Sequence, residues 1–541
     1  MSKACLLIGM LLIAGCASDL SPYLGDPDDA RRVEPLELTT RPAKTATTQP
    51  TTQPAGRTVE LTLSAARRIA LANNTNVGIA EIDPQIAAAG LSVEQGAFEA
   101  TFGVDARYAK QDSPFINQTI FSPDGSGDTS VVRVQGGQLD ALTIDPSLTK
   151  PLRTGGQVRV TAPIDRVETD QGRLLNPQWE QDVRVSISQP LLRGFGSDAS
   201  ELGIRIAATE VAAARQRLKV TVVDTIAAVD RAYWQLWSAR RAVEVREEQL
   251  QLVGEQLERA QRRFRAGSTG ELEVVRAESA QADATEELVA AVGQADRAQR
   301  ALRDLMSVRL ESSPFAVGNS SALEPSTKAA AVPYSLEPRK LVTMAMQRRG
   351  ELAEARVAEL AEQARLLNAS REAYLPRLDV FYEWGVNGLG GDYDGAVDQL
   401  GSGDFQDQTI GLTFEQPLGN RVRRQQLRQS LLRRAQRLLD VRRRQEIIKR
   451  EVYDACEGID TGYERILAAR QRVATAERLL AAEERQVDAG ATSSAELLES
   501  QRNLASARLS LASAISQYEI ARVDLAAATG TVLGKAGVVL E

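Results

Sequence analysis

The chain has 541 residues, of which 43% are hydrophobic, 25% are charged and only 4% are aromatic. It contains no histidine, the side chain that most often acts as a general base or binds a metal near neutral pH. This composition argues against an enzyme, the net charge of −7 gives no reason to expect a nucleic acid partner, and the abundance of Ala, Leu, Arg, Glu and Gln is typical of long helices.

Residues 1–15 have the features of an export signal. Lys3 supplies a positive charge, residues 6–13 form an apolar run too short to span a bilayer, and small residues precede Cys16. The segment resembles a bacterial lipoprotein signal, which implies cleavage before Cys16 and covalent attachment of lipid to it; no other cofactor is expected. Ala17 and Ser18, rather than an acidic residue, follow Cys16, which favours the outer membrane. An ordinary secretory signal with an incidental cysteine is the alternative.

Residues 16–57 are predicted to be the lipidated N-terminus and a tether. The stretch from Thr39 to Pro54 is rich in Thr, Pro and Gln and has almost no apolar side chains to bury, so we expect it to be extended.

A first structural repeat is predicted over residues 58–306. The apolar spacing in residues 61–74 predicts a short amphipathic helix, and a second helix follows to about Ala97, with Pro84 as a candidate first-turn residue. Alternation over residues 100–108 and 182–188 then predicts two strands, and Pro190 with the glycines after it ends the second one. Two weaker runs between them, residues 130–138 and 156–164, are predicted to form a long hairpin extension.

Two stretches offset by 223 residues place large apolar residues seven apart. The first contains Val229, Leu236, Val243, Leu250, Leu257 and Phe264, and the second contains Val452, Ile459, Ile466, Val473, Leu480 and Val487. A sustained seven-residue spacing predicts helices that coil around each other, here over about residues 199–266 and 421–489. Each would be roughly 100 Å long, whereas a membrane core is about 30 Å thick, so these helices must project through an aqueous space.

Both long helices end in a glycine-containing turn, after which a second helix is predicted. Glycine permits a left-handed turn, and small polar residues cap the helix that follows. The two tips consist of Gly267, Ser268, Thr269 and Gly270, and of Gly490, Ala491, Thr492 and Ser493.

A second repeat over residues 334–530 follows the same order of elements. Its helices are predicted at 336–347 and 351–374, and its strands at 378–386 and 410–414, before the second long helix. Residues 307–333 form a linker rich in Ser, Pro and Ala, and residues 531–541 a C-terminal tail. The plan of each copy is thus two helices, two strands and two long helices.

Four principal strands with one apolar and one polar face cannot close a barrel, since the smallest membrane barrels have about eight strands. An open sheet edge in hydrocarbon would leave backbone groups unpaired. The chain must therefore share its sheet with identical copies, and three chains would supply twelve strands.

The duplicated plan, the Gln-Pro-Leu exits at Gln189 and Gln416, and the Ala-Gly-x-Thr tips resemble the TolC-type outer-membrane efflux protein family, over roughly residues 58–530. The lipoprotein signal matches the lipoprotein branch of that family. The resemblance implies a mainly α fold with a membrane β-barrel contribution: a homotrimer with a shared 12-stranded β-barrel in the outer membrane of a Gram-negative-type bacterium and an α-barrel tunnel in the periplasm. Its implied partners are a periplasmic adaptor (membrane fusion) protein, an inner-membrane pump and outer-membrane lipid, and it implies no catalysis.

Two sets of site residues follow from this resemblance. Glu496 and Glu499 match an acidic ring that narrows the tunnel, where three copies would attract cations and repel anions. The alternative for Glu496 is a capping box with Ser493; Glu273 has the same place after the first tip, whereas the counterpart of Glu499 is Arg276. The two tips are expected to contact the adaptor.

The predicted function is a passive exit duct for small molecules. The outer-membrane channel of a type I protein secretion system is an alternative, and a lipid-anchored periplasmic coiled-coil scaffold without a pore is another. The arginines between Arg421 and Arg444 are expected to form a solvated face, with lipid binding or lumen lining as alternatives. Tyr233, Trp234, Trp237 and Cys456 are predicted to be packing residues.

Overall fold

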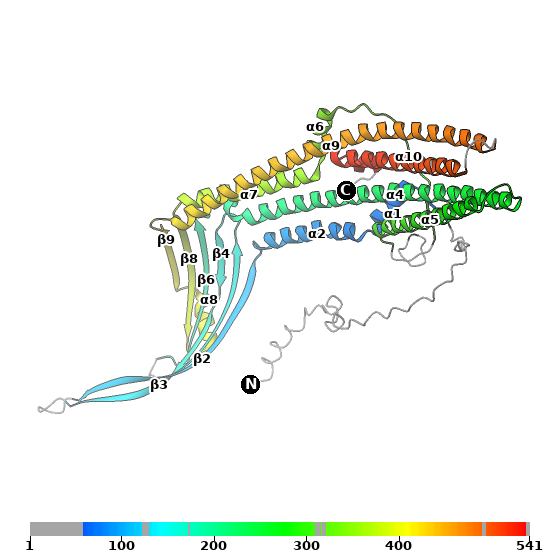
Figure 1. The fold of residues 1–541 in the computed structure, drawn as a ribbon. Helices are drawn as coiled ribbons and strands as arrows, with labels where there is room; N and C mark the ends of the chain where they lie inside the picture. The colour runs from blue at the N-terminus through cyan, green and yellow to red at the C-terminus, as the bar shows by residue number, and fades with distance from the viewer. Residues whose placement is uncertain are drawn as a thin grey trace. The chain divides into compact units, whose positions relative to one another are not determined.

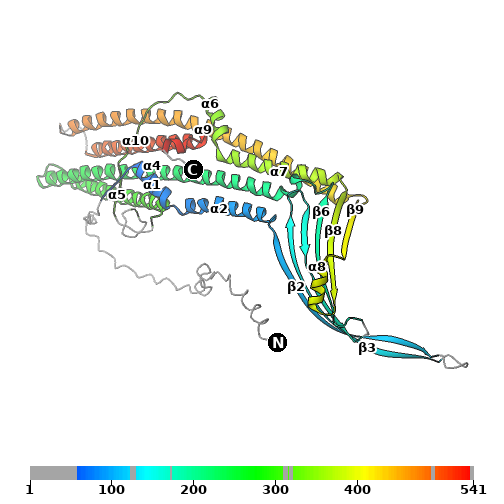
Figure 2. The same ribbon diagram turned by 180° about the vertical axis from the view of Figure 1, so that it is seen from behind.

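The computed structural model describes residues 58–121, 129–170, 174–308, 315, 321–488 and 494–536, all within one compact unit, Gly56–Glu541. The signal, Cys16 and the tether lie outside the described residues. Figures 1 and 2 show two repeats of helices and strands in this unit. The elements of the first repeat are β1 (Val59–Leu61), α1 (Leu63–Asn73), α2 (Thr75–Gly96), β2 (Thr101–Phe121), β3 (Thr129–Pro151), β4 (Gln157–Thr161), β5 (Ile164–Thr169), β6 (Gln178–Pro190), α3 (Ser197–Ser200), α4 (Leu202–Arg265) and α5 (Glu271–Met306).

The second repeat has fewer strands. Its elements, with the short strand that precedes it, are β7 (Leu323–Pro325), α6 (Pro338–Arg348), α7 (Gly350–Tyr374), β8 (Arg377–Gly390), α8 (Tyr393–Ser402), β9 (Gln406–Glu415), α9 (Arg421–Asp488), α10 (Ser494–Thr529) and α11 (Val532–Ala536). The predicted linker is not wholly irregular, because β7 pairs in parallel with β1.

The second helix begins nine residues earlier than Pro84 suggested. The side chain of Asn74 accepts hydrogen bonds from the backbone N–H groups of Asn76 and Val77, which caps α2 at its first turn. Pro84 therefore lies inside α2, where it costs one helical hydrogen bond. The cap residue, rather than the proline, determines where this helix begins.

The long helices lie in a single layer whose neighbours differ at its two ends. Near the sheet the order is α2, α4, α7 and α9, since α4 contacts α2 and α7, and α9 contacts α7. Farther from the sheet the order is α5, α4, α10 and α9. Figures 1 and 2 show this arrangement from both sides, with α2 and α5 at one edge of the layer and α9 at the other.

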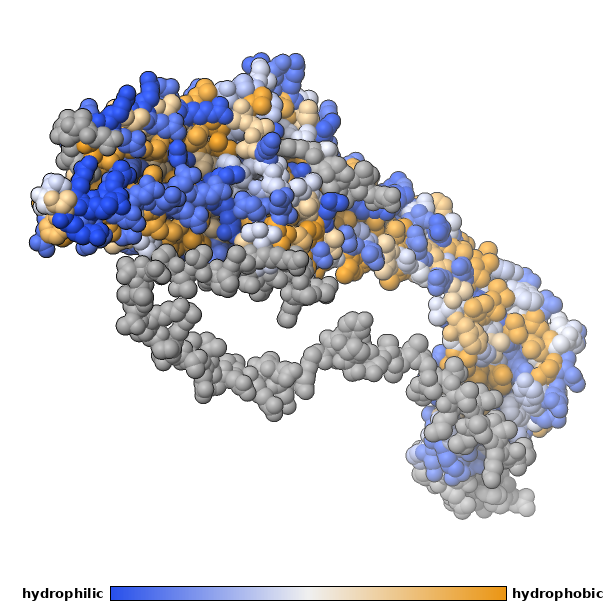
Figure 3. Space-filling view, turned by 90° about the vertical axis from the view of Figure 1, so that its right-hand side faces the viewer, coloured by the Kyte–Doolittle hydropathy of each residue, from blue (hydrophilic) through white to orange (hydrophobic). Residues whose placement is uncertain are grey.

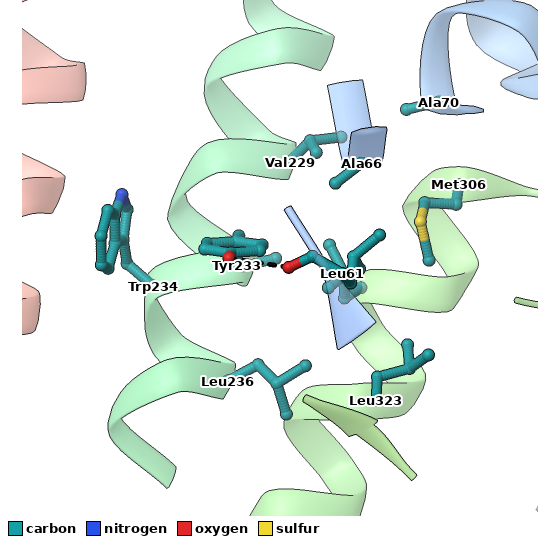
Figure 4. Close-up of a cluster of buried hydrophobic side chains, with 11 residues drawn as sticks. Leu61, Ala66, Ala70, Val229, Tyr233, Trp234, Leu236, Met306 and Leu323 are labelled. Atoms are coloured by element: carbon teal, nitrogen blue, oxygen red, sulfur yellow. Dashed lines mark hydrogen bonds between the residues drawn. The ribbon is translucent and has the colours of Figure 1, made fainter. Parts of the chain in front are cut away.

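The largest buried cluster joins α1, α4, α5 and the paired strands β1 and β7 (Figure 4). At its centre the Tyr233 ring is fully buried, and its hydroxyl lies 2.9 Å from the carbonyl oxygen of Leu61 and 3.0 Å from the backbone nitrogen of Thr327. Trp234 and Trp237 stack edge to face beside it. The prediction that these aromatic residues serve packing is confirmed.

The seven-residue seam of the second long helix is confirmed. Val452, Ile459 and Ile466 are at most 2% exposed, and Leu480 and Val487 are 9% exposed. Gly462 allows Tyr518 of α10 to approach so closely that an added β-carbon would lie 3.2 Å from its ring. In the first seam Val229 and Leu236 are buried, but Phe264 is 46% exposed, so its predicted burial is wrong. Phe264 lies next to the tip, near the end of α4.

Candidate functional site

Apart from the β1–β7 pair, the described strands form one sheet with six strand positions, in the order β2, β3, β4 with β5, β6, β8 and β9. β4 and β5 occupy the same position, because both pair with β3 on one side and β6 on the other. Backbone hydrogen bonds bridge the break between them: the N–H of Ala162 donates to the oxygen of Pro146, and the N–H of Asp182 donates to the oxygen of Pro163. Residues 157–169 therefore act as one strand interrupted at Pro163, which has no N–H to donate.

The predicted strand count of four principal strands per chain is too low. Residues 130–138 do not pair with residues 156–164 as predicted; they pair with β2, where Ser130 lies opposite Ile120. The segment 157–161 pairs instead with residues 147–151 of β3 and 184–188 of β6. Prolines 146, 151 and 163 interrupt the alternation of this region, which is why its period of two was weak in the sequence.

One face of the sheet, here the apolar face, is covered by aliphatic and aromatic side chains from all six strand positions. The register aligns these residues from strand to strand, and many are exposed, with Ile410 77%, Leu412 69% and Phe102 68% exposed. Figure 3 shows apolar residues gathered in the strand region toward the lower right. The apolar face consists of Phe102, Val104, Ala106, Tyr108, Leu142, Ile144, Leu148, Val158, Val160, Ile164, Val183, Val185, Ile187, Leu378, Val380, Tyr382, Trp384, Val386, Ile410, Leu412 and Phe414.

The opposite face, here the polar face, carries charged and hydroxyl side chains of both signs. Neighbouring strands bond across it, as where the Thr143 hydroxyl donates to Asp165 at 2.5 Å and the Arg159 guanidinium donates to Thr149 at 3.2 Å. The polar face includes Asp105, Arg107, Thr143, Asp145, Ser147, Arg159, Asp165, Asp182, Arg184, Ser186, Asp379, Glu383, Asn387 and Thr409. Membrane barrels have two faces of this kind, an apolar one toward hydrocarbon and a polar one toward water.

A short helix that the sequence did not predict, α8, packs against the far end of the apolar face. Added β-carbons at Gly388 and Gly390 would overlap the backbone of Ala396, so these glycines are required for the close approach. Tyr393 of α8 meets the ring of Trp179 edge to face at 5.7 Å between centroids. The two glycines two positions apart at the end of β8 were the available sequence signal.

The first tip is a tight turn, as predicted. Gly267 has φ of +71°, in the left-handed region, and the backbone N–H of Ser268 donates to the carbonyl oxygen of Arg263 at 2.9 Å. Gly270 is the N-cap of α5. The second tip, Gly490, Ala491, Thr492 and Ser493, lies outside the described residues, as does the proposed capping role of Ser493.

Apolar side chains next to the first tip are exposed. Phe264, Leu272 and Val275 are 46%, 61% and 52% exposed. The sequence did not predict these three residues as contact residues. Their positions within eight residues of Gly267 could have indicated that they lie at the tip.

Glu496 and Glu499 lie in the first two turns of α10, and both are exposed. Leu497, Ser500 and Gln501, which alternate with them, are buried against the neighbouring helices. In the first repeat the corresponding residues, Glu273 and Arg276, form an ion pair at 3.5 Å. The second repeat thus has two exposed carboxylates where the first has a neutral pair.

The arginines at the start of α9 divide into two groups. Arg423 and Arg434 pair with Glu372 and Glu359 of α7 at 3.4 and 3.3 Å and join the two helices. The remaining ones predicted as a solvated face are largely exposed, including Arg421, Arg424, Arg428, Arg433 and Arg437. The residues of each ion pair are more than fifty positions apart in the sequence. The spacing of the arginines within α9 therefore could not predict these pairs.

The two edges of the helical layer carry apolar residues that no described element covers. On α2 these are Ile79, Ile82 and Ile86, at least 53% exposed, and on α9 they are Leu431, Leu432, Leu438 and Leu439, at least 43% exposed. The sheet has matching open edges, since β2 and β9 each have one neighbouring strand among the described residues. No helix in the described part of the chain is apolar enough over eighteen residues to be a candidate membrane span.

The sequence profile described as outer membrane efflux protein matches residues 157–308 and 341–531. No curated protein sequence matches the chain.

Solved structures of outer-membrane channels have a similar fold. The CmeC channel of Campylobacter jejuni is 17% identical, with 87% of this chain and 85% of that chain covered and a TM-score of 0.62. A membrane protein from Pseudomonas aeruginosa is 19% identical over 86% and 93% of the two chains, with a TM-score of 0.62. The open state of the MtrE channel of Neisseria gonorrhoeae is 15% identical over 87% and 89%, with a TM-score of 0.59. At these identities the likeness concerns the fold.

Proposed function

This chain belongs to the outer membrane efflux protein family, and from that premise we propose that it is the outer-membrane duct of a tripartite efflux system for small molecules. Members of this family are channels rather than enzymes, and so is this chain. In the proposed system a periplasmic adaptor and an inner-membrane pump deliver solutes to the tunnel, and the chain provides a passive route to the outside.

The observation that carries the proposal is the sheet with one apolar face and two open edges. In hydrocarbon each unpaired backbone group at an edge would cost several kcal/mol. Identical copies remove that cost if β9 of one chain pairs with β2 of the next. β9 and β2 run in opposite directions within the sheet, so this seam would be antiparallel, like every other pair in the sheet.

The helical edges support a homotrimer closed in the same way. Inside the chain, α4 of the first repeat packs on α7 of the second, with Arg217 3.6 Å from Glu354. The equivalent contact between chains would place α9 of one copy on α2 of the next. That contact would cover Ile79, Ile82 and Leu439, which are 58%, 53% and 63% exposed in the single chain. Burying such side chains favours association by about 25 cal/mol per Å².

We assign Glu496 and Glu499 to the constriction of the tunnel. Both carboxylates are exposed on α10, and the first repeat offers no competing pair because Arg276 neutralises Glu273. Three chains would bring six carboxylates to one level of the tunnel, which favours cations.

We assign the tips at Gly267–Gly270 and Gly490–Ser493 to the adaptor contact. The exposed apolar residues Phe264, Leu272 and Val275 beside the first tip support this, since a cluster of exposed apolar side chains is typical of a protein-binding surface. The lipid anchor on Cys16 and the outer-membrane location of that anchor remain proposals based on the sequence, because those residues lie outside the described part of the chain.

Planar-bilayer conductance of the purified full-length protein tests the function. We expect discrete, cation-preferring channels, and we expect Glu496→Gln with Glu499→Gln to reduce the cation preference. Glu477→Gln, on the exposed side of α9 away from the tip, is the control and should leave the preference unchanged. A folded protein without conductance would contradict the proposed duct function and favour a scaffold. A cation preference that is the same in the double variant would contradict only the assignment of Glu496 and Glu499 to the constriction.

A further inference from the structure

The first repeat carries an insertion in the middle of its sheet. We propose that this insertion is part of the membrane wall, so that three chains build a barrel of eighteen strands with a wide, water-filled exit that passes bulky polar solutes. The inference rests on the proposed duct and adds the size and lining of its outer end.

The two repeats locate the insertion. Before the sheet the repeats are offset by 275 residues, since α1 begins at Leu63 and α6 at Pro338. After the sheet the offset is 223 residues, since α4 ends at Arg265 and α9 at Asp488. From the start of its first short helix to the end of its long helix, the first repeat therefore has 52 more residues than the second, the difference between the two offsets. Those residues supply β3 and the interrupted strand β4 with β5, two strand positions that the second repeat lacks.

The inserted strands are interior to the sheet rather than attached to its surface. β3 is paired on both sides at residues 139–144 and 147–149, with β2 on one side and with β5 and then β4 on the other. β4 and β5 in turn pair with β6. Removing them would separate β2 from the rest of the sheet, so the six positions form one continuous wall.

The inserted strands also have the two faces that a membrane wall needs. Leu142, Ile144 and Leu148 of β3 continue the apolar face, as do Val158, Val160 and Ile164 of the next position. At the far end this face becomes charged: Lys110 lies 3.9 Å from Asp140, and Arg166 pairs with Glu168 at 2.5 Å. An apolar band that ends in charged residues and the aromatic Tyr108 and Trp179 is typical of a strand leaving the hydrocarbon layer.

The inserted strands are long enough to cross a membrane. A tilted transmembrane strand needs about 9–11 residues. The shared strand position of β4 and β5 spans residues 157–169, and the doubly paired part of β3 spans residues 139–149. Beyond this region β2 and β3 continue as a two-stranded ribbon that extends past the other strands (Figure 1).

Strand number determines the width of the exit. With strands about 4.8 Å apart and tilted by about 40°, twelve strands give a barrel about 24 Å across between backbones, and eighteen give about 36 Å. Barrels of sixteen to eighteen strands leave an aqueous channel. The lining would be the polar face, on which Arg107, Arg159 and Arg184 alternate with Asp105, Asp165 and Asp182. Such a mixed lining suits solutes that are bulky and hydrated, without selecting one sign of charge.

The internal repeat predicts how the wall closes. Ile187 of β6 lies opposite Tyr382 of β8 inside the chain. The equivalent residues, aligned by the Gln-Pro-Leu exits and by the alternating apolar residues of β2 and β8, are Phe414 of β9 and Ala106 of β2. Phe414 of one chain should therefore lie opposite Ala106 of the next, with both side chains on the apolar face.

Cryo-electron microscopy of the full-length trimer in nanodiscs tests the proposal by counting strands around the barrel. Eighteen strands are expected. Twelve strands, with β2 and β3 folded away from the wall, would overturn the proposal while leaving the duct intact; the absence of a trimeric barrel would overturn the proposed function as well.

Cysteine cross-linking gives an independent answer. In a Cys456→Ala background, Ala106→Cys with Phe414→Cys should form disulfides between chains on oxidation. Val160→Cys with Phe414→Cys should not, because β4 lies inside the sheet. If β2 and β3 were folded away from the wall, β4 would become the edge and the second pair would cross-link in place of the first.

Discussion

Thr161 and Ile164 lie on the two sides of Pro163 and meet β6 in one unbroken register, opposite Arg184 and Gln181. Three positions separate the residues on both strands, so no residue is gained or lost at the break. The proline interrupts the hydrogen bonding of a single strand and does not divide the sheet into two.

Shortening the sheet should narrow the exit. In a variant that replaces residues 110–177 with Asn-Gly, a tight turn would join β2 directly to β6, with Ala109 opposite Gln178 and Phe102 opposite Val185. The barrel would lose two strand positions per chain and become about 12 Å narrower. Polyethylene glycol reduces the conductance of a channel when the polymer is small enough to enter it. With polymer added on the barrel side of a planar bilayer, the largest polymer that reduces the conductance should be smaller for this variant than for the unaltered protein.

The matched control replaces residues 113–137 with Asn-Gly. It removes the ribbon beyond the sheet and keeps all six strand positions, since Asp112 and Gln138 are already opposite each other. An unchanged polymer cut-off is expected. Equal cut-offs for all three proteins would contradict the wide exit.

Replacing Tyr233 with Phe should destabilise the helical part of the chain. The hydroxyl accepts a hydrogen bond from the backbone N–H of Thr327 at 3.0 Å, and its removal leaves that donor without this partner in a buried cluster. The cost is about 1–3 kcal/mol, measured as a lower thermal midpoint by circular dichroism. Tyr453→Phe, at a side chain that is 50% exposed, should not change the midpoint. Equal midpoints for both variants would show that the Thr327 contact contributes nothing.

Gly388→Ala should displace α8 from the apolar face, because the new β-carbon would overlap the carbonyl oxygen of Ala396. Faster proteolysis within residues 393–402 is the expected sign. Gly401→Ala in the same helix meets no atom within 4 Å and should strengthen the helix by about 0.5–1 kcal/mol. If Gly388→Ala were as resistant as Gly401→Ala, the close packing of α8 on β8 would be wrong.

The Cys456 thiol should react slowly even in mildly alkaline solution. Burial raises its pKa, with a smaller contribution from the nearby charge of Asp460, so less of the reactive thiolate is present at any given pH than for a free cysteine. Maleimide modification of the native protein should stay slow up to about pH 9, near the ordinary thiol pKa, and become fast in denaturant. Native rates equal to those in denaturant would contradict this.

The helical seams could be predicted from the sequence because a repeated local pattern determines them. Val452, Ile459 and Ile466 recur every seven residues and are buried as predicted. The same pattern failed at Phe264, where the spacing continues to the end of α4 but the side chain is 46% exposed. A local pattern therefore predicts which side of a helix is apolar, and the neighbouring elements decide where burial ends.

The inserted strands were predicted poorly because prolines and glycines weaken their alternation, and pairing partners far apart in the chain are not encoded locally. Residues 130–138 were assigned to the wrong partner for this reason. The two repeat offsets contain the missing information, since 52 extra residues are enough for two strands and their turns. Long-range ion pairs such as Arg434 with Glu359 have no comparable signal.

Closure by identical copies is the central claim, and a cross-link between the helical edges tests it most directly. An added β-carbon at Gly350 of α7 would lie 3.3 Å from the backbone oxygen of Gln216 in α4; the equivalent residues at the two outer edges are Thr75 of α2 and Leu439 of α9. In a Cys456→Ala background, a short bis-maleimide should convert Thr75→Cys with Leu439→Cys into a covalent trimer on a denaturing gel, while either single variant stays monomeric. A folded double variant that remains monomeric after treatment would contradict the claim.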